Sequence, residues 1–114
     1  MNPRIASLEK MLGGPRDGAL LRFSLGNEYL KEGNAAEAGK CFQAAVDRDK
    51  NYSAAWKALG KARSETGDHQ GALDAYEQGI AVAEARGDIQ AAKEMTVFAR
   101  RLKIALAERS ISIS

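Results

Sequence analysis

The residue types that most often carry enzymatic chemistry are scarce in this sequence. The 114 residues include one histidine, His69, and one cysteine, Cys41. One Cys and one His cannot supply the three or four protein ligands that zinc takes, so we predict no metal site. No general base lies near Cys41 along the chain, which favours an inert, partly buried thiol. His69 directly follows Asp68, a candidate helix cap, and we expect it on the surface in the first turn of a helix.

The glycine-rich and acidic stretches also indicate structure and not catalysis. Gly13-Gly14-Pro15 lacks the Lys-Ser/Thr pair that grips phosphate in a nucleotide-binding loop. Carboxylates such as Glu65 and Asp68 stand near expected helix ends, where they are solvated. We therefore predict a non-catalytic protein that takes no cofactor.

The composition predicts an all-α fold. Strand-favouring residues are scarce, while Ala, Leu, Glu, Lys and Arg dominate. The chain length suits a single domain, residues 1–114. A formal charge of +2 is too small to argue for nucleic acid or an anionic membrane as the main target.

The location of the protein is predicted from the same bulk features. No run approaches the roughly 20 apolar residues of a membrane span. The N-terminal residues are too polar for a signal peptide, and a single cysteine fits a reducing compartment. We expect a cytoplasmic protein that does not bind membranes.

Glycines and capping residues divide the chain into about six expected helices. Gly33, Gly67 and Gly87 can each end a helix, because glycine tolerates the left-handed backbone conformation. The polar residue after each glycine can cap the helix that follows. The expected ranges are 3–12, about 17–32 with Asp17 or a neighbour as cap, 35–47, 53–66, 69–85 and 89–108, and the tail 110–114 is expected to fray.

The sequence repeats itself with a constant offset. Small residues recur where facing helices would approach closely, and Phe42 and Tyr76 recur where they would fill the space beside them. At an offset of 34, the matched positions are Leu25–Gly26 with Leu59–Gly60, Gly33 with Gly67, Ala38 with Ala72, Phe42 with Tyr76, and Val46 with Ile80. This repetition predicts two copies of one helical hairpin, residues 19–52 and 53–86.

The repeat resembles the tetratricopeptide repeat (TPR), a 34-residue helix–turn–helix module. The motif positions are Leu25, Gly26, Tyr29, Ala38, Phe42 and Ala45 in the first copy, and Trp56, Leu59, Gly60, Gly67, Ala72 and Tyr76 in the second. Arg22 replaces the usual Trp of the first copy, and in the second Arg63 replaces a Tyr and Gly79 replaces an Ala. The resemblance implies a right-handed superhelical stack of antiparallel helix pairs.

The flanking segments extend this expected stack. Residues 3–15 would form an N-terminal half-repeat, because Leu8 and Leu12 stand one repeat length before Phe42 and Val46. Residues 88–109 would form a C-terminal capping helix, since the uncovered end of a repeat array exposes apolar surface. Its core positions, at an offset of 36, would be Ala92, Met95 and Ala99.

The resemblance also implies a binding surface, because the first helix of each repeat lines a concave groove in this family. The residues expected to contact a partner are Leu20, Phe23, Asn27, Leu30, Lys31, Lys57, Lys61, Lys93, Arg100 and Arg101. This groove would run from an apolar end to a basic middle and would suit a peptide with a hydrophobic anchor and acidic residues. Leu20 and Phe23 could instead be covered by the N-terminal helix, and the two middle lysines could be merely solvated.

Asn27 resembles the Asn of the carboxylate clamp, with which some TPR proteins hold the acidic C-terminal tail of large heat-shock chaperones. The clamp also requires Lys, Asn and basic residues at positions that are Phe23, Ala58, Gln90 and Glu94 here. We therefore reject that specific activity and keep a protein or peptide of more general acidic character as the predicted partner.

Two alternative functions remain open. The domain could self-associate by burying Phe23 and Leu30 between copies, so that the expected state is a monomer or a weak homodimer. It could also bind nucleic acid or an anionic surface through Arg100, Arg101 and Lys103, in which case binding would fall steeply with salt.

Overall fold

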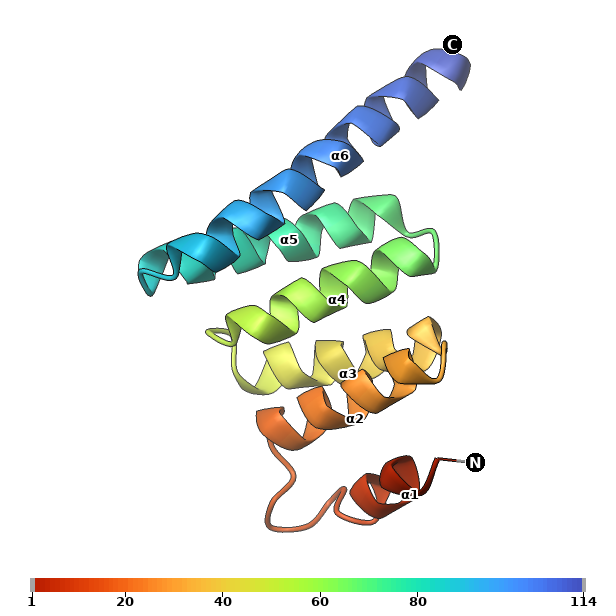
Figure 1. The fold of residues 1–114 in the computed structure, drawn as a ribbon, viewed down its shortest axis with the longest axis vertical. Helices are drawn as coiled ribbons and strands as arrows, with labels where there is room; N and C mark the ends of the chain where they lie inside the picture. Colours follow the sequence, from red (N-terminus) through yellow and green to blue (C-terminus); the bar gives the residue numbers. More distant parts are fainter. Residues whose placement is uncertain (1, 114) are drawn as a thin grey trace.

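The computed structural model describes residues 2–113, in which the regular elements are six α-helices (Figure 1). Consecutive helices from α2 onward pack side by side in antiparallel pairs, and α2 also contacts α4 while α4 contacts α6. The helices are α1 (Pro3–Glu9), α2 (Ala19–Lys31), α3 (Ala35–Arg48), α4 (Ser53–Glu65), α5 (His69–Ala85) and α6 (Ile89–Ile113). The predicted all-α stack of helix pairs is confirmed.

Three of the connections between helices are built in the same way. Gly33, Gly67 and Gly87 take φ of 76°, 86° and 77°, the left-handed region that a side chain would strain. The residue after each glycine donates its backbone N–H to a carbonyl of the ending helix, and its side chain accepts an N–H of the next. The backbone N–H groups of Asn34, Asp68 and Asp88 donate to the carbonyls of Tyr29 (2.9 Å), Arg63 (2.9 Å) and Ala83 (2.8 Å). Their side chains accept the backbone N–H groups of Glu37, Gly71 and Ala91, respectively.

Glycines also set how closely paired helices approach. A Cβ on Gly26 would lie 2.5 Å from Cε1 of Phe42, and one on Gly60 would lie 2.6 Å from Cε1 of Tyr76. Phe42 is fully buried. The two pairs hold equivalent places in the two repeats, so each glycine makes room for the aromatic ring of the second helix.

The unusual Gly79 has an equally direct explanation. A Cβ at this position would lie 2.5 Å from Sδ of Met95 and 2.9 Å from Cβ of Trp56. Met95 is fully buried in the cluster between α5 and α6, and Ala92 and Ala99 are buried with it. Gly79 therefore lets α6 pack closely on α5.

Two helix boundaries differ from the sequence expectation. Helix α1 ends at Glu9 and not near residue 12, whereas Gly18, the neighbour of Asp17, takes the N-cap position of α2 as expected. Helix α6 continues to Ile113, past the predicted end near residue 109 where a frayed tail was expected. The segment Ala105–Arg109 consists of strong helix formers, which carry the helix onward. Ser114 lies outside the described residues.

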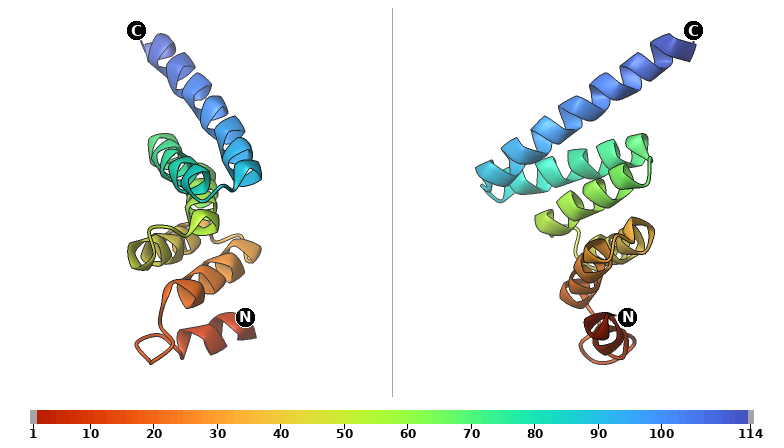
Figure 2. Two further views of the ribbon diagram at one scale, coloured as in Figure 1. Left: turned by 90° about the vertical axis from the view of Figure 1, so that its left-hand side faces the viewer. Right: turned by 45° about the vertical axis from the view of Figure 1, so that its right-hand side comes forward.

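The elements form an elongated stack with α1 at one end and α6 at the other (Figure 2). Among the described residues, α1 has no buried side chain and packs on α2 alone, whereas α6 packs along α5. In the part of the chain that the structure describes, no helix combines the length and the apolar character that crossing a membrane requires.

Candidate partner-binding groove

A hollow of about 520 Å³ lies where α2, α4, α5 and α6 meet, and it has an apolar floor with a polar rim. Helix α2 contributes to it because α2 contacts α4, and α6 contributes because α6 contacts α4 from the other side. Its floor is lined by Phe23, Leu30, Ala54, Ala58, Tyr76 and Phe98, and its rim by Asn27, Lys57 and Lys61. We call this the central hollow.

Ring contacts fix the aromatic side chains of the central hollow. Phe23 lies with its ring centroid 5.8 Å from that of Phe42 and 4.9 Å from that of Tyr52. Tyr76 and Phe98 lie 5.5 Å apart, centroid to centroid. Burial raises the pKa of Tyr76 to about 12, so the phenol stays neutral at physiological pH. The floor is therefore preorganised and uncharged.

The charged groups at the rim differ in how they are engaged. Lys57 Nζ lies 3.4 Å from a carboxylate oxygen of Glu94, which joins α4 to α6 across the edge of the hollow. Lys61 is exposed and forms no ion pair with any carboxylate in residues 2–113. Lys61 is thus available to an acidic ligand, whereas Lys57 must first break its ion pair with Glu94.

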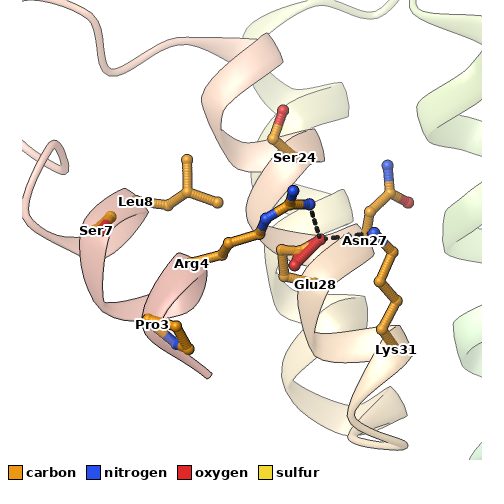
Figure 3. Close-up of a pocket in the computed structure, with 8 residues that line it drawn as sticks. All are labelled: Pro3, Arg4, Ser7, Leu8, Ser24, Asn27, Glu28 and Lys31. Carbon is orange, nitrogen blue, oxygen red and sulfur yellow. Dashed lines mark hydrogen bonds and ion pairs between the residues drawn. The ribbon is translucent and has the colours of Figure 1, made fainter. Parts of the chain in front are cut away.

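A second hollow, of about 570 Å³, separates α1 from α2 (Figure 3). Figure 3 shows Arg4 and Lys31 converging on Glu28, at 3.9 Å and 3.0 Å. Glu28 is buried, and the hydrogen bond and charge of Lys31 lower the pKa of its carboxyl. Asn27 lines both hollows, so the two hollows adjoin at this residue.

The structure brings five of the ten predicted partner-binding residues into one site. Phe23, Asn27, Leu30, Lys57 and Lys61 all line the central hollow. They come from two helices of successive repeats, α2 and α4, as the repeat pattern indicated. Whether a partner binds there stays a prediction.

The other five predicted residues lie elsewhere. Leu20 is 69% exposed at the start of α2, and Lys31 faces Glu28 in the hollow beside α1. Arg100 lines a separate hollow between α5 and α6. Lys93 and Arg101 are exposed on α6 and line none of these hollows.

Helix α1 does not cover the apolar end of the groove. Leu20 is exposed, and Phe23 packs against Phe42 and Tyr52. The α1 side of α2 is formed instead by Ser24, Asn27, Glu28 and Lys31. Phe23 therefore remains open to the central hollow.

Two floor residues were missed from the sequence. Tyr76 was expected only as a packing residue, yet it both packs on Phe98 and lines the hollow. Phe98 was not expected at all. It stands two repeat lengths after Leu30, another floor residue, so the unshifted repeat offset could have found it.

The described part of the chain holds no cluster of metal ligands, and its cysteine is buried. No group of three His, Cys, Asp or Glu side chains within residues 2–113 could hold a metal ion. Cys41 is buried, and desolvation raises the pKa of its thiol, which disfavours the reactive thiolate.

Sequence comparison finds relatives along most of the chain. A model of the tetratricopeptide repeat family matches residues 19–52. A TPR repeat-containing protein of Pseudomonas aeruginosa is 55% identical over 98 residues, which cover 86% of this chain and 93% of the relative. The heat-shock protein cognate co-chaperone sgt12 of Aspergillus fumigatus is 40% identical over 65 residues, which cover 57% of this chain and 19% of the co-chaperone.

Solved structures share the architecture. A protein from Bordetella parapertussis superposes with a TM-score of 0.76 at 44% identity, covering 92% of this chain and 91% of that one. The Sgt2 TPR domain from Aspergillus fumigatus also superposes with a TM-score of 0.76. It is 30% identical, and the match covers 92% of this chain and 68% of that one. Together with the glycine–aromatic pairs that recur in both repeats, these similarities show that the chain belongs to the tetratricopeptide repeat family.

Proposed function

We propose that this protein is a non-catalytic interaction module that binds a peptide segment of a partner protein in the central hollow. One observation carries the proposal: an open apolar floor, including Phe23, Leu30 and Phe98, is bordered by Lys57 and Lys61. TPR domains generally mediate protein–protein interactions, and the similarity to a co-chaperone supports such a role. An apolar side chain of the peptide would fill the hollow while acidic neighbours meet the lysines.

The size of the hollow bounds what it can contribute to affinity. Burying one Leu- or Phe-sized anchor yields about 1.5–3 kcal/mol. That is less than the roughly 8 kcal/mol of a micromolar complex, and association also costs rigid-body freedom. The peptide must therefore make further contacts, and Asn27 offers them because it lines both the central hollow and the hollow beside α1.

The site is not organised as a carboxylate clamp. Phe23 and Ala58, at positions where the clamp has Lys and Asn, contribute to the apolar floor. Glu94, at a position where the clamp is basic, pairs with Lys57. The proposed ligand is therefore an internal or terminal segment with an apolar anchor beside acidic side chains.

The basic residues of α6 are less well suited to bind a partner. Lys103 Nζ pairs with Glu77 at 3.6 Å, and Arg100 lies with it between α5 and α6. Arg101 follows on a different side of the helix, since successive residues turn by about 100°. These cations do not form one basic patch suited to nucleic acid.

The test is a peptide array in which a central Leu or Phe is flanked by Glu, with Lys-flanked versions of the same peptides. We expect the Glu-flanked set to bind the wild-type chain. The variant Lys57→Glu with Lys61→Glu should lose at least about tenfold in affinity for the selected peptide, because both rim charges are reversed. Fluorescence anisotropy measures the affinity.

A control variant separates the local charge from the overall charge. Lys10→Glu with Lys50→Glu changes the net charge equally, at exposed residues that line neither hollow. It should bind like the wild type, and both variants should keep the helical circular dichroism. Equal binding by the Lys57/Lys61 variant, or equal binding of Lys-flanked peptides, would rule out the proposed site.

A further inference from the structure

The outward side of α6 carries a line of exposed aliphatic residues. Val97, Ile104 and Ile111 are 42%, 53% and 74% exposed. They are seven residues apart, and this spacing places them along one stripe of a helix. Met95 and Leu102, which are buried against α5, lie on the opposite side. We call this line the α6 stripe.

Helix α6 also extends beyond the helix on which it packs. It has 25 residues and α5 has 17, a difference of about 12 Å at 1.5 Å per residue. Figures 1 and 2 show its C-terminal part projecting past the stack. Within residues 2–111, Leu106 is the last hydrophobic side chain packed against the core cluster. A short helical segment without tertiary packing is marginal in water, so a helix from elsewhere would stabilise this one.

We propose that the α6 stripe pairs with α6 of a second copy of this chain, antiparallel, in a two-fold symmetric homodimer. Counting heptads with Val97, Ile104 and Ile111 at position a puts the small residue Ala107 at position d. Ile104 of each copy then lies opposite Ala107 of the other. Because of the two-fold symmetry, each contact between the copies occurs twice.

The charges beside the stripe favour a second copy over an unrelated partner. Arg101 and Glu108 both fall at position e of the heptads. In the antiparallel alignment of Ile104 with Ala107, Arg101 of each copy lies opposite Glu108 of the other. The pairs of Arg101 with Glu108 thus make the stripe complementary to itself in charge at position e.

The arrangement of the d positions selects the antiparallel direction. Parallel helices would place Arg100 opposite Arg100 and Lys93 opposite Lys93, two pairs of like charge at the seam. The antiparallel alignment places Arg100 opposite Ile111, where the aliphatic stem of Arg can cover the isoleucine and its guanidinium can reach water.

The expected dimer is weak, because the contact is short. In this alignment the contact between the two copies runs from Arg100 to Ile111, about 17 Å of helix or roughly one and a half heptads. Such a contact falls at or below the small end of specific protein interfaces. Association should therefore depend on concentration in the range from about 5 to about 500 μM.

Sedimentation velocity over that concentration range tests the proposal. The wild type should shift from monomer to dimer, and Ile104→Glu should weaken association at least tenfold while keeping its helical circular dichroism. Arg101→Glu and Glu108→Arg should each weaken it, since each places like charges opposite one another. Arg109→Glu, an equal charge change on the other side of the helix, should associate like the wild type.

Charge exchange gives the sharper readout. The double variant Arg101→Glu with Glu108→Arg should dimerise again, and an equimolar mixture of the two single variants should form a heterodimer. A wild type that is monomeric throughout, or a dimer unaffected by Ile104→Glu such as one buried through Phe23 and Leu30, overturns the proposal. Failure of the double variant to recover overturns the antiparallel alignment.

Discussion

Arg22 shows how a residue that departs from the repeat pattern can serve the structure. It stands where the TPR motif usually has Trp, and its Nε and terminal nitrogen donate to Asp17 at 2.8 Å and 2.9 Å. Asp17 also accepts the backbone N–H of Gly13 at 2.8 Å and lies 4.0 Å from Arg48 of α3. One carboxylate therefore joins the loop after α1 to both helices of the first repeat.

This pairing predicts a pH-dependent contribution to stability. The hydrogen bonds from Arg22 hold the pKa of the Asp17 carboxyl well below its usual range. A lowered folded-state pKa means that the stabilisation is complete above the unfolded pKa of about 3.9 and is lost as the pH falls through the folded-state pKa. Asp17→Asn should therefore be less stable than the wild type at pH 7, and this difference should shrink below about pH 4.

Urea unfolding across this pH range measures the difference directly. Asp74→Asn is the matched control, because Asp74 is exposed and only accepts a bond from Gln70 one turn away. The free energy of unfolding of this control should differ little from that of the wild type at neutral pH. A destabilisation of the Asp17 variant that is the same at pH 3 and pH 7 would contradict the assigned role.

At the scale of elements, the distance between paired helices depends on glycine. Gly60→Ala would place a methyl group 2.6 Å from the Tyr76 ring, which is held between α4 and α6. Overpacking of this kind costs about 1–3 kcal/mol. Gly39→Ala is a matched control inside α3, since its Cβ would meet only Ala62 at 3.8 Å. Gly39→Ala should gain up to about 1 kcal/mol of stability, because alanine has a higher helix propensity than glycine.

Relative to the wild type, Gly60→Ala should thus be less stable and Gly39→Ala more stable. Thermal or urea unfolding measures the stability of both variants. If Gly60→Ala were as stable as Gly39→Ala, the close approach of α4 and α5 would not depend on the missing side chain.

The elements that sequence predicted well are those made by local or repeated contacts. Glycine turns with a following Asn or Asp are local, and the pairs Gly26–Phe42 and Gly60–Tyr76 recur at the same places in both repeats. The core positions of α6 (Ala92, Met95 and Ala99) were also predicted correctly, but the face of α6 that borders the groove was not. Arg100 was expected in the groove and instead lines the hollow at the edge of α5 and α6, while Phe98 lines the central hollow. The pairing of Asp17 with Arg22 was missed since Asp17 lies outside the repeats.

At the scale of the whole molecule, the central hollow depends on contacts between alternate helices. Phe23 and Phe98 come from the helices on either side of α4, and they line the same hollow because α4 contacts both α2 and α6. The Lys57–Glu94 ion pair, at 3.4 Å, is the charged contact between α4 and α6 at its edge. Any acidic ligand therefore competes with a carboxylate of the protein itself.

This competition predicts a gain of affinity from Glu94→Gln. Lys57 loses its internal partner and becomes available, so the Glu-flanked peptide should bind several-fold more tightly. Stability should change by less than about 1 kcal/mol, because the ion pair is solvent-exposed. Glu77→Gln is the matched control: it removes an ion pair to Lys103 of 3.6 Å, outside the hollow. Anisotropy titrations that gave unchanged or weaker binding for the Glu94 variant would show that Lys57 does not meet the ligand.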